Sequence, residues 1–197
     1  MRSESTTPAD RVAGLRDAAA KQPDSATAHL QLGTALAKTG AIGEAEREFQ
    51  RALELEPEMP EALVNLGGVF LARWDFKQCV EVNRRAAERR PTLLHAHYNQ
   101  GLGHLYLGEA VEMVGCFQRV LELDPRSAGG RYFLAVGLHA VGQLEEARKH
   151  LAIAIELGFH PEPEFLRALE RAGNDAVPVL ELGENRENEL PERTRRT

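Results

Sequence analysis

The stretch ATAHLQLGTALAKTGAIGEAEREFQRALELEPEM, residues 26–59, decides the fold. Apolar residues recur three and four positions apart on both sides of Gly40, a pattern that predicts two amphipathic helices joined by a turn. Pro57 ends the second helix, because proline cannot donate the next backbone hydrogen bond. A hairpin of two helices cannot bury its apolar stripe alone, so the sequence must supply neighbours that stack on it.

Those neighbours are visible as a repeat of 34 residues, in which glycine, proline and small residues keep a common phase. The glycines are Gly33, Gly67 and Gly101, and the prolines are Pro23, Pro57, Pro91 and Pro125. Alanines keep the phase at Ala18, Ala52, Ala86 and Ala154, with Val120 between them. The spacing predicts four stacked helical hairpins, at 26–59, 60–93, 94–127 and 128–161.

This pattern resembles the tetratricopeptide repeat family, whose unit is a helix–turn–helix of 34 residues. The resemblance rests on Leu32-Gly33, Phe49, Ala52 and Pro57 in the first copy and on their counterparts in the others. The fourth copy departs from the pattern, with Ala135 at the glycine position and Phe159 at the proline position. The resemblance implies an all-α fold, a right-handed α-solenoid of helix–turn–helix repeats.

The flanks complete this domain organisation. We expect a flexible N-terminus over 1–8 and an N-terminal partial repeat or cap helix over 9–25. After the fourth repeat, 162–173 reads as a capping helix with Phe165, Leu166 and Leu169 on one face. The polar segment 174–197 mixes charges of both signs with little apolar content, which predicts disorder.

The resemblance also implies a concave groove lined by the first helices, where a peptide or helix of a partner protein would bind. The groove positions form a mostly apolar surface with asparagine amides available to a ligand backbone, the alternative being that they only pack between helices. The candidate residues are Leu30, Val64, Asn65, His95, Tyr98, Asn99, Leu102, Tyr132, Val136 and His139. Tyr98 and Tyr132 are the favoured anchors, because aromatic side chains dominate interface energetics.

Three polar residues occupy positions where a helical repeat normally buries apolar ones: Asn83, Gln100 and His104. A hydrogen-bonded network at the junction of the second and third repeats would explain all three, while a hinge or a functional site are the alternatives. Trp74 stands at a turn position where glycine is common. An exposed ring there would indicate a second contact site or self-association, and packing of the ring on the adjacent turn is the alternative.

Composition excludes several classes of function. The net charge of −6 disfavours binding to nucleic acid, and no apolar run is long enough to insert into a membrane. The first ten residues lack a secretory signal, so we expect a cytoplasmic protein, with Cys79 and Cys116 as reduced, buried thiols.

The sequence shows no catalytic motif, and we expect neither an enzyme nor a cofactor. His95, His97 and His104 lack the spacing of metal ligands, so we also expect no metal site. The prediction is a scaffold or adaptor with a protein or peptide partner. The alternatives are a self-associating assembly factor, which would be a homo-oligomer, and an accessory or metal-responsive module of an enzyme complex.

Overall fold

The computed structural model describes residues 7–174, and this part of the chain contains helices and no strand. The helices of the four repeats pair as α2 (Ala26–Lys38) with α3 (Ile42–Leu55), α4 (Pro60–Ala72) with α5 (Phe76–Arg89), α6 (Leu94–Leu107) with α7 (Ala110–Leu123), and α8 (Ala128–Ala140) with α9 (Leu144–Glu156). The remaining helices are α1 (Pro8–Lys21), which packs on α2, and α10 (Pro163–Asn174), which packs on α9.

Side-chain caps and left-handed turns set the helix boundaries. Thr7 and Asp10 form a reciprocal capping box at the start of α1, so this helix begins at Pro8, inside the segment predicted to be flexible. Ser25 and Ser127 cap first helices, and Asp75 caps α5. The rest of the predicted N-terminal segment, residues 1–6, and nearly all of the predicted polar tail, from residue 175 on, lie outside the described residues.

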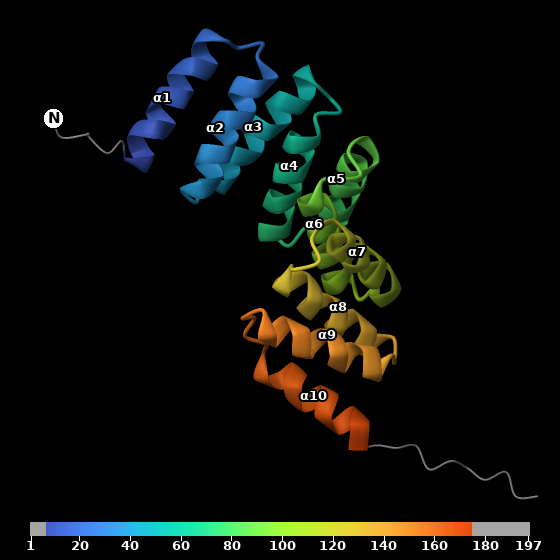
Figure 1. Ribbon diagram of the computed structural model, residues 1–197. Helices are drawn as coiled ribbons and strands as arrows, with labels where there is room; N and C mark the ends of the chain where they lie inside the picture. Colours follow the sequence, from blue (N-terminus) through green and yellow to red (C-terminus); the bar gives the residue numbers. More distant parts are fainter. Residues whose placement is uncertain (1–6, 175–197) are drawn as a thin grey trace, which may run out of the picture.

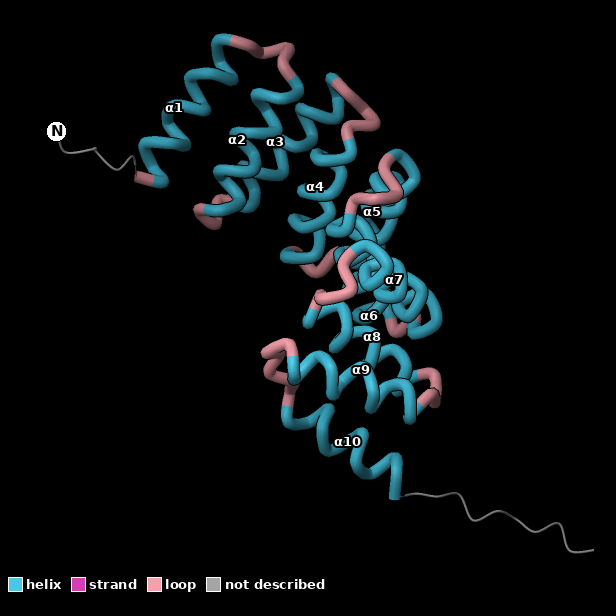
Figure 2. The backbone as a smooth tube through the Cα atoms, viewed as in Figure 1, coloured by secondary structure: helices cyan, strands magenta, loops and turns pink. Residues whose placement is uncertain are grey.

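The paired helices stack into an elongated, curved array, with α1 and α10 at its two ends (Figure 1). Short loops join successive helices throughout (Figure 2). Successive first helices also touch each other, since α4 contacts both α2 and α6. The structure is thus the all-α solenoid that the repeat predicts, and none of its described helices is long and apolar enough to span a membrane.

The buried side chains form two main clusters along the array. The N-terminal cluster includes Leu32, Phe49, Leu63 and Val82, while the C-terminal cluster includes Phe117. Burial also raises the pKa of both cysteine thiols to about 11, and both cysteines are free. Cys79 is buried as predicted, whereas Cys116 is half-buried.

The three polar residues predicted to form one network do not do so. Asn83 is fully buried, and its Nδ2 donates to the backbone carbonyl of Cys79 at 2.8 Å. His104 instead contacts the carboxylate of Glu109 through Nδ1 at 2.6 Å, and Gln100 joins neither of them among the described hydrogen bonds. The network prediction was wrong, because Asn83 and His104 each find a partner on their own helix or in the following turn.

Candidate functional site

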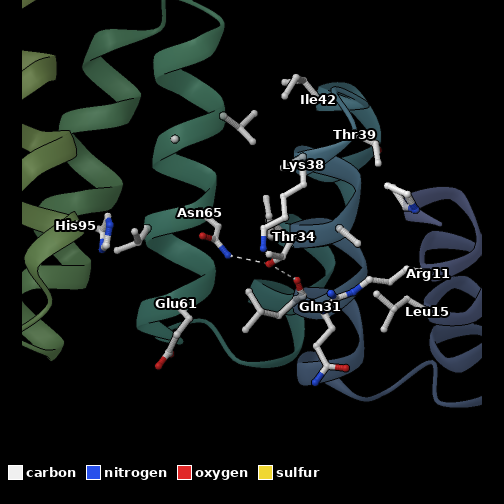
Figure 3. Close-up of a pocket in the computed structure, with 18 of the residues that line it drawn as sticks. Arg11, Leu15, Gln31, Thr34, Lys38, Thr39, Ile42, Glu61, Asn65 and His95 are labelled. Atoms are coloured by element: carbon white, nitrogen blue, oxygen red, sulfur yellow. Dashed lines mark hydrogen bonds between the residues drawn. The ribbon is translucent and has the colours of Figure 1, made fainter. Parts of the chain in front are cut away.

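A groove with a volume of about 1210 Å³ lies in the N-terminal half of the array. It is lined by α1, α2, α4 and α6, together with the start of α3 (Figure 3). Leu15, Leu30, Ile42, Val64 and Leu93 give it an apolar lining, and polar side chains lie between these residues. Such a mixed lining, mostly apolar with a few placed polar groups, is characteristic of ligand sites.

Asn65 is the central polar group of the groove. Its Nδ2 donates to Thr34 Oγ1 at 3.1 Å, and Thr34 Oγ1 donates in turn to the backbone carbonyl of Leu30 at 2.8 Å (Figure 3). This short chain of hydrogen bonds ties α4 to α2 and fixes the orientation of the amide. An asparagine amide has two N–H donors and one carbonyl acceptor, so Asn65 keeps an N–H and its Oδ1 for a further partner.

Asn99 repeats this arrangement 34 residues later in the sequence. Its Nδ2 donates to the backbone carbonyl of Val64 at 3.4 Å, which ties α6 to α4 as Asn65 ties α4 to α2. Both asparagines line the groove. The two amides therefore have a structural role between first helices, and each still has hydrogen-bonding capacity left for a ligand.

Two cations point into the groove without an acidic partner. Arg11 extends from α1 and Lys38 from α2, and neither side chain forms an ion pair with any carboxylate of the described residues (Figure 3). The acidic residue of the lining, Glu61, is neutralised by Arg90 at 2.5 Å and points away from Thr34 and Asn65. The groove therefore carries net positive charge between α1 and α2.

The groove contains only part of the predicted surface. It gathers Leu30, Val64, Asn65, His95 and Asn99, of which Val64 is buried and His95 exposed. The other five predicted residues lie outside the groove lining, in the C-terminal half of the array: Tyr98, Leu102, Tyr132, Val136 and His139.

Tyr132 was predicted to be an anchor in the groove, but its side chain is buried, with only 7% of its surface exposed. Its ring stacks on Phe159 at 4.3 Å and meets Phe165 of α10 edge to face at 5.6 Å. Phe159, which stands where the other repeats have proline, and the capping helix α10 thus cover Tyr132. His139 lies against the same Phe165, with ring centroids 5.6 Å apart.

Tyr98 is half-buried and also packs internally. Its ring meets Phe117 and Phe133 edge to face at 5.4 and 6.0 Å. A Cβ atom at Gly129 would lie 2.7 Å from the Tyr98 hydroxyl, so this glycine lets the ring lie close to α8. Leu102 and Val136 are partly buried against the same C-terminal cluster. For these residues, packing between helices, the alternative considered from sequence, describes the structure better.

The clustered histidines have separate surroundings. His95 lines the groove, His97 Nε2 lies 3.0 Å from the carbonyl of Pro91, and His104 pairs with Glu109. Within residues 7–174, no group of three or more histidine, cysteine or acidic side chains is placed to hold a metal ion.

The sequence prediction missed Arg11 and Lys38. Arg11 comes from a helix outside the four repeats, and Lys38 ends α2 next to the expected groove positions of the first repeat. A signal was present nonetheless: neither residue has an acidic residue three or four positions away. Arg84 shows the contrast, since it pairs with Glu81 and Glu88 on its own helix.

Comparison with known proteins agrees with this architecture. Residues 26–59 match the sequence model of the family described as "Tetratricopeptide repeat". The chain is also 26% identical over 138 residues to a peroxisomal targeting signal receptor of Eremothecium gossypii. That match covers 64% of this chain and 24% of the receptor, so the chain spans about a quarter of the length of its curated relative.

Solved structures with the same fold include MamA and YrrB. The MamA fragment from residue 41 to the end, from Desulfovibrio magneticus RS-1, has a TM-score of 0.70 at 23% identity and covers 76% of this chain and 85% of that one. YrrB, described as a TPR protein with an unusual peptide-binding site, has a TM-score of 0.65 at 24% identity over 82% of this chain and 81% of its own. The resemblance to the tetratricopeptide repeat family is confirmed, and the solved structures show that the chain shares their fold.

Proposed function

We propose that the chain is an adaptor whose N-terminal groove binds a peptide segment of a partner protein. The observation that carries this proposal is the groove itself, with its apolar lining, the amides of Asn65 and Asn99, and the unpaired cations Arg11 and Lys38. The proposal assigns binding to this site and no catalytic step.

Size favours a peptide over a small molecule. Pockets for drug-sized ligands have volumes of about 300–1,000 Å³, and this groove is larger, about 1210 Å³. It also runs across several helices rather than forming a closed cavity (Figure 3). A segment of several residues would place side chains on Leu30 and Val64 and its backbone near the two amides.

Charge defines the kind of segment. Arg11 and Lys38 are the uncompensated charges of the lining, because Glu61 is already paired with Arg90. A segment with apolar residues and an acidic side chain would complement both features, since charge-assisted hydrogen bonds to a carboxylate are about twice as strong as neutral ones. The helices are packed before binding, so little protein ordering entropy opposes the complex.

The peptide-binding relative supports the class of function and not the ligand. YrrB carries a peptide-binding site on a fold of this kind. A fold hosts many unrelated partners, so the choice of segment must come from the groove of this chain.

Selection from a random peptide library on the immobilised full chain would test the proposal. Selected peptides would then be titrated by fluorescence anisotropy against the wild type and a Lys38→Glu/His95→Glu variant. Both side chains line the groove and have no hydrogen-bonding or ion-pair partner among the described residues, so the variant should fold normally. We expect peptides with apolar and acidic residues, and affinity reduced by about tenfold or more in the variant.

Arg126→Glu is the matched control, because Arg126 is an exposed cation at the turn before α8, outside the groove lining. Its affinity should stay within about twofold of the wild type. Failure to select any peptide, or equal binding by the groove variant, would refute the proposal.

A further inference from the structure

Trp74 has a backbone conformation that suits glycine. Its φ angle is +63°, and the residues 34 positions before it and 34 and 68 positions after it are Gly40, Gly108 and Gly142, with φ angles of +81°, +76° and +81°. A side chain in this left-handed region meets the following carbonyl oxygen and is disfavoured. Three of these four turns have glycine, which this geometry favours, whereas the turn of the second repeat has tryptophan, the largest side chain.

The ring of Trp74 is also exposed, with 74% of its surface accessible, and it does not stand alone. Its centroid lies 5.9 Å from both Phe76 and Tyr106, and these two rings stack on each other at 4.5 Å. Tyr106 is itself 54% exposed. Phe76 opens α5 and Tyr106 lies near the end of α6, so the aromatic cluster of Trp74, Phe76 and Tyr106 joins two repeats.

An exposed aromatic surface of this kind has the composition of an interface. Tryptophan and tyrosine are enriched among the residues that dominate binding energy. None of the three residues of the aromatic cluster lines the groove, so this surface is separate from the proposed peptide site. Rigid stacking between the rings means that they lose little side-chain freedom on contact with a partner.

The charges around the aromatic cluster indicate which partner. Arg73 forms an ion pair with Glu46, and Glu109 Oε2 lies 2.6 Å from His104 Nδ1, so both groups already have a partner. Asp75 and Lys77 flank Phe76, are exposed, and form no ion pair within residues 7–174. The surface therefore carries one unpaired charge of each sign beside its exposed rings.

We propose that the aromatic cluster binds the same cluster of a second copy of this chain, as a two-fold symmetric dimer. In such a contact, if residue i of the first copy meets residue j of the second, then residue j of the first copy also meets residue i of the second. Asp75 of each copy then pairs with Lys77 of the other, and the two sets of rings pack between these pairs. A rim of one sign would repel its own copy, whereas this rim is complementary to itself.

Sedimentation velocity on the full chain, over about a hundredfold range of concentration, tests the dimer by mass action. We expect the mean mass to rise from monomer toward dimer in the wild type and to stay monomeric in Trp74→Gly. Glycine adopts φ +63° without strain, so this variant keeps the turn and the fold. Trp74 is the single tryptophan of the chain, so a blue shift of its emission on concentration reports burial of this surface alone.

Charge reversal tests the two-fold pairing. Lys77→Glu and Asp75→Lys should each weaken the dimer at least severalfold, because each brings like charges together. An equimolar mixture of the two variants should restore it, because every pair is then of opposite sign. Asp75 also caps α5 through Gln78, so circular dichroism must first show that Asp75→Lys is folded. If it is not, Lys77→Glu alone carries the charge test.

A wild type that stays monomeric at all concentrations would overturn the proposal and leave the aromatic cluster to a different protein. Equal dimerisation by Trp74→Gly, or by Lys77→Glu, would overturn it as well. A folded pair of charge variants that fails to associate on mixing would refute the two-fold arrangement.

Discussion

Gly67 of α4 lies directly against Asn83 of α5, and a Cβ atom at Gly67 would sit 2.0 Å from Asn83 Nδ2. The same crossing recurs in the neighbouring repeats with an aromatic partner, since a Cβ at Gly33 or Gly101 would meet Phe49 or Phe117 at 2.7 Å. The glycine therefore permits the two helices of a repeat to pack closely, whichever residue faces it. The second repeat alone fills this position with a buried amide.

Replacing Gly67 by alanine should destabilise the fold, because the added methyl group overlaps the buried Asn83 side chain. Overpacking of this kind costs about 1–3 kcal/mol. Gly68→Ala is the matched control, since a Cβ there meets nothing within 4 Å and alanine favours a helix. The free energy of unfolding, measured in urea, should be lower than that of the wild type for Gly67→Ala and not for Gly68→Ala. Equal decreases in the two variants would argue against the overlap.

Asn83→Leu should stabilise the protein. The Oδ1 atom of Asn83 is buried and has no hydrogen-bonding partner among the described atoms, and a buried unsatisfied acceptor costs about 1–3 kcal/mol. In the fourth repeat Leu151 occupies the equivalent position, 68 residues later, so leucine suits this crossing. We expect the free energy of unfolding, measured by thermal denaturation, to be about 1 kcal/mol higher in Asn83→Leu than in the wild type.

The reverse exchange provides the control for that prediction. Leu151→Asn should lose about 2–4 kcal/mol, because it buries a polar group in an apolar cluster. A melting temperature of Asn83→Leu below that of the wild type would show that the amide contributes more through its bond to Cys79 than its free oxygen costs.

His150 should make stability depend on pH. Burial lowers its pKa below the ordinary value of 6.5, and the nearby positive charge of Arg131 lowers it further, while Glu146 acts in the opposite direction. The unfolded chain then binds the proton more tightly than the folded one, so acidification favours unfolding. The contribution of His150 is complete above about pH 6.5 and is lost as the pH falls toward the lowered pKa.

His150→Gln removes this titration. The free energy of unfolding, measured in urea at a series of pH values, should fall less steeply with acidification in the variant than in the wild type. Identical pH profiles would show that His150 does not titrate differently in the folded and unfolded chains.

Sequence periodicity was sufficient to predict the helices and most of their packing. The spacing of Gly33, Phe49 and Ala52 is set by the crossing of two helices, and local sequence carries that geometry. Prolines in the same phase follow the ends of second helices, with Pro57 after α3 and Pro91 after α5. These features depend on residues close together in the chain, which is why the pattern alone reveals them.

The candidate site was only half predictable, because its limits depend on contacts between distant segments. Tyr132 occupies a groove position in its repeat, yet Phe159 and Phe165 cover it after the chain turns back into α10. Arg11 reaches the groove from a helix that belongs to no full repeat. No periodicity within the repeats encodes either arrangement.

The division of the core has a consequence for how the array unfolds. Among the described helices, α6 alone supplies side chains to both main clusters, with Ala96 in the N-terminal one and Tyr98 in the C-terminal one. In a linear array each unit is stabilised mainly by its immediate neighbours, so cooperativity is limited by the weakest junction. Unfolding that begins in the C-terminal cluster therefore reaches the N-terminal cluster only through α6. The groove and the cluster around Trp74 both lie on the N-terminal side or at this junction, so both could outlast loss of the C-terminal repeat.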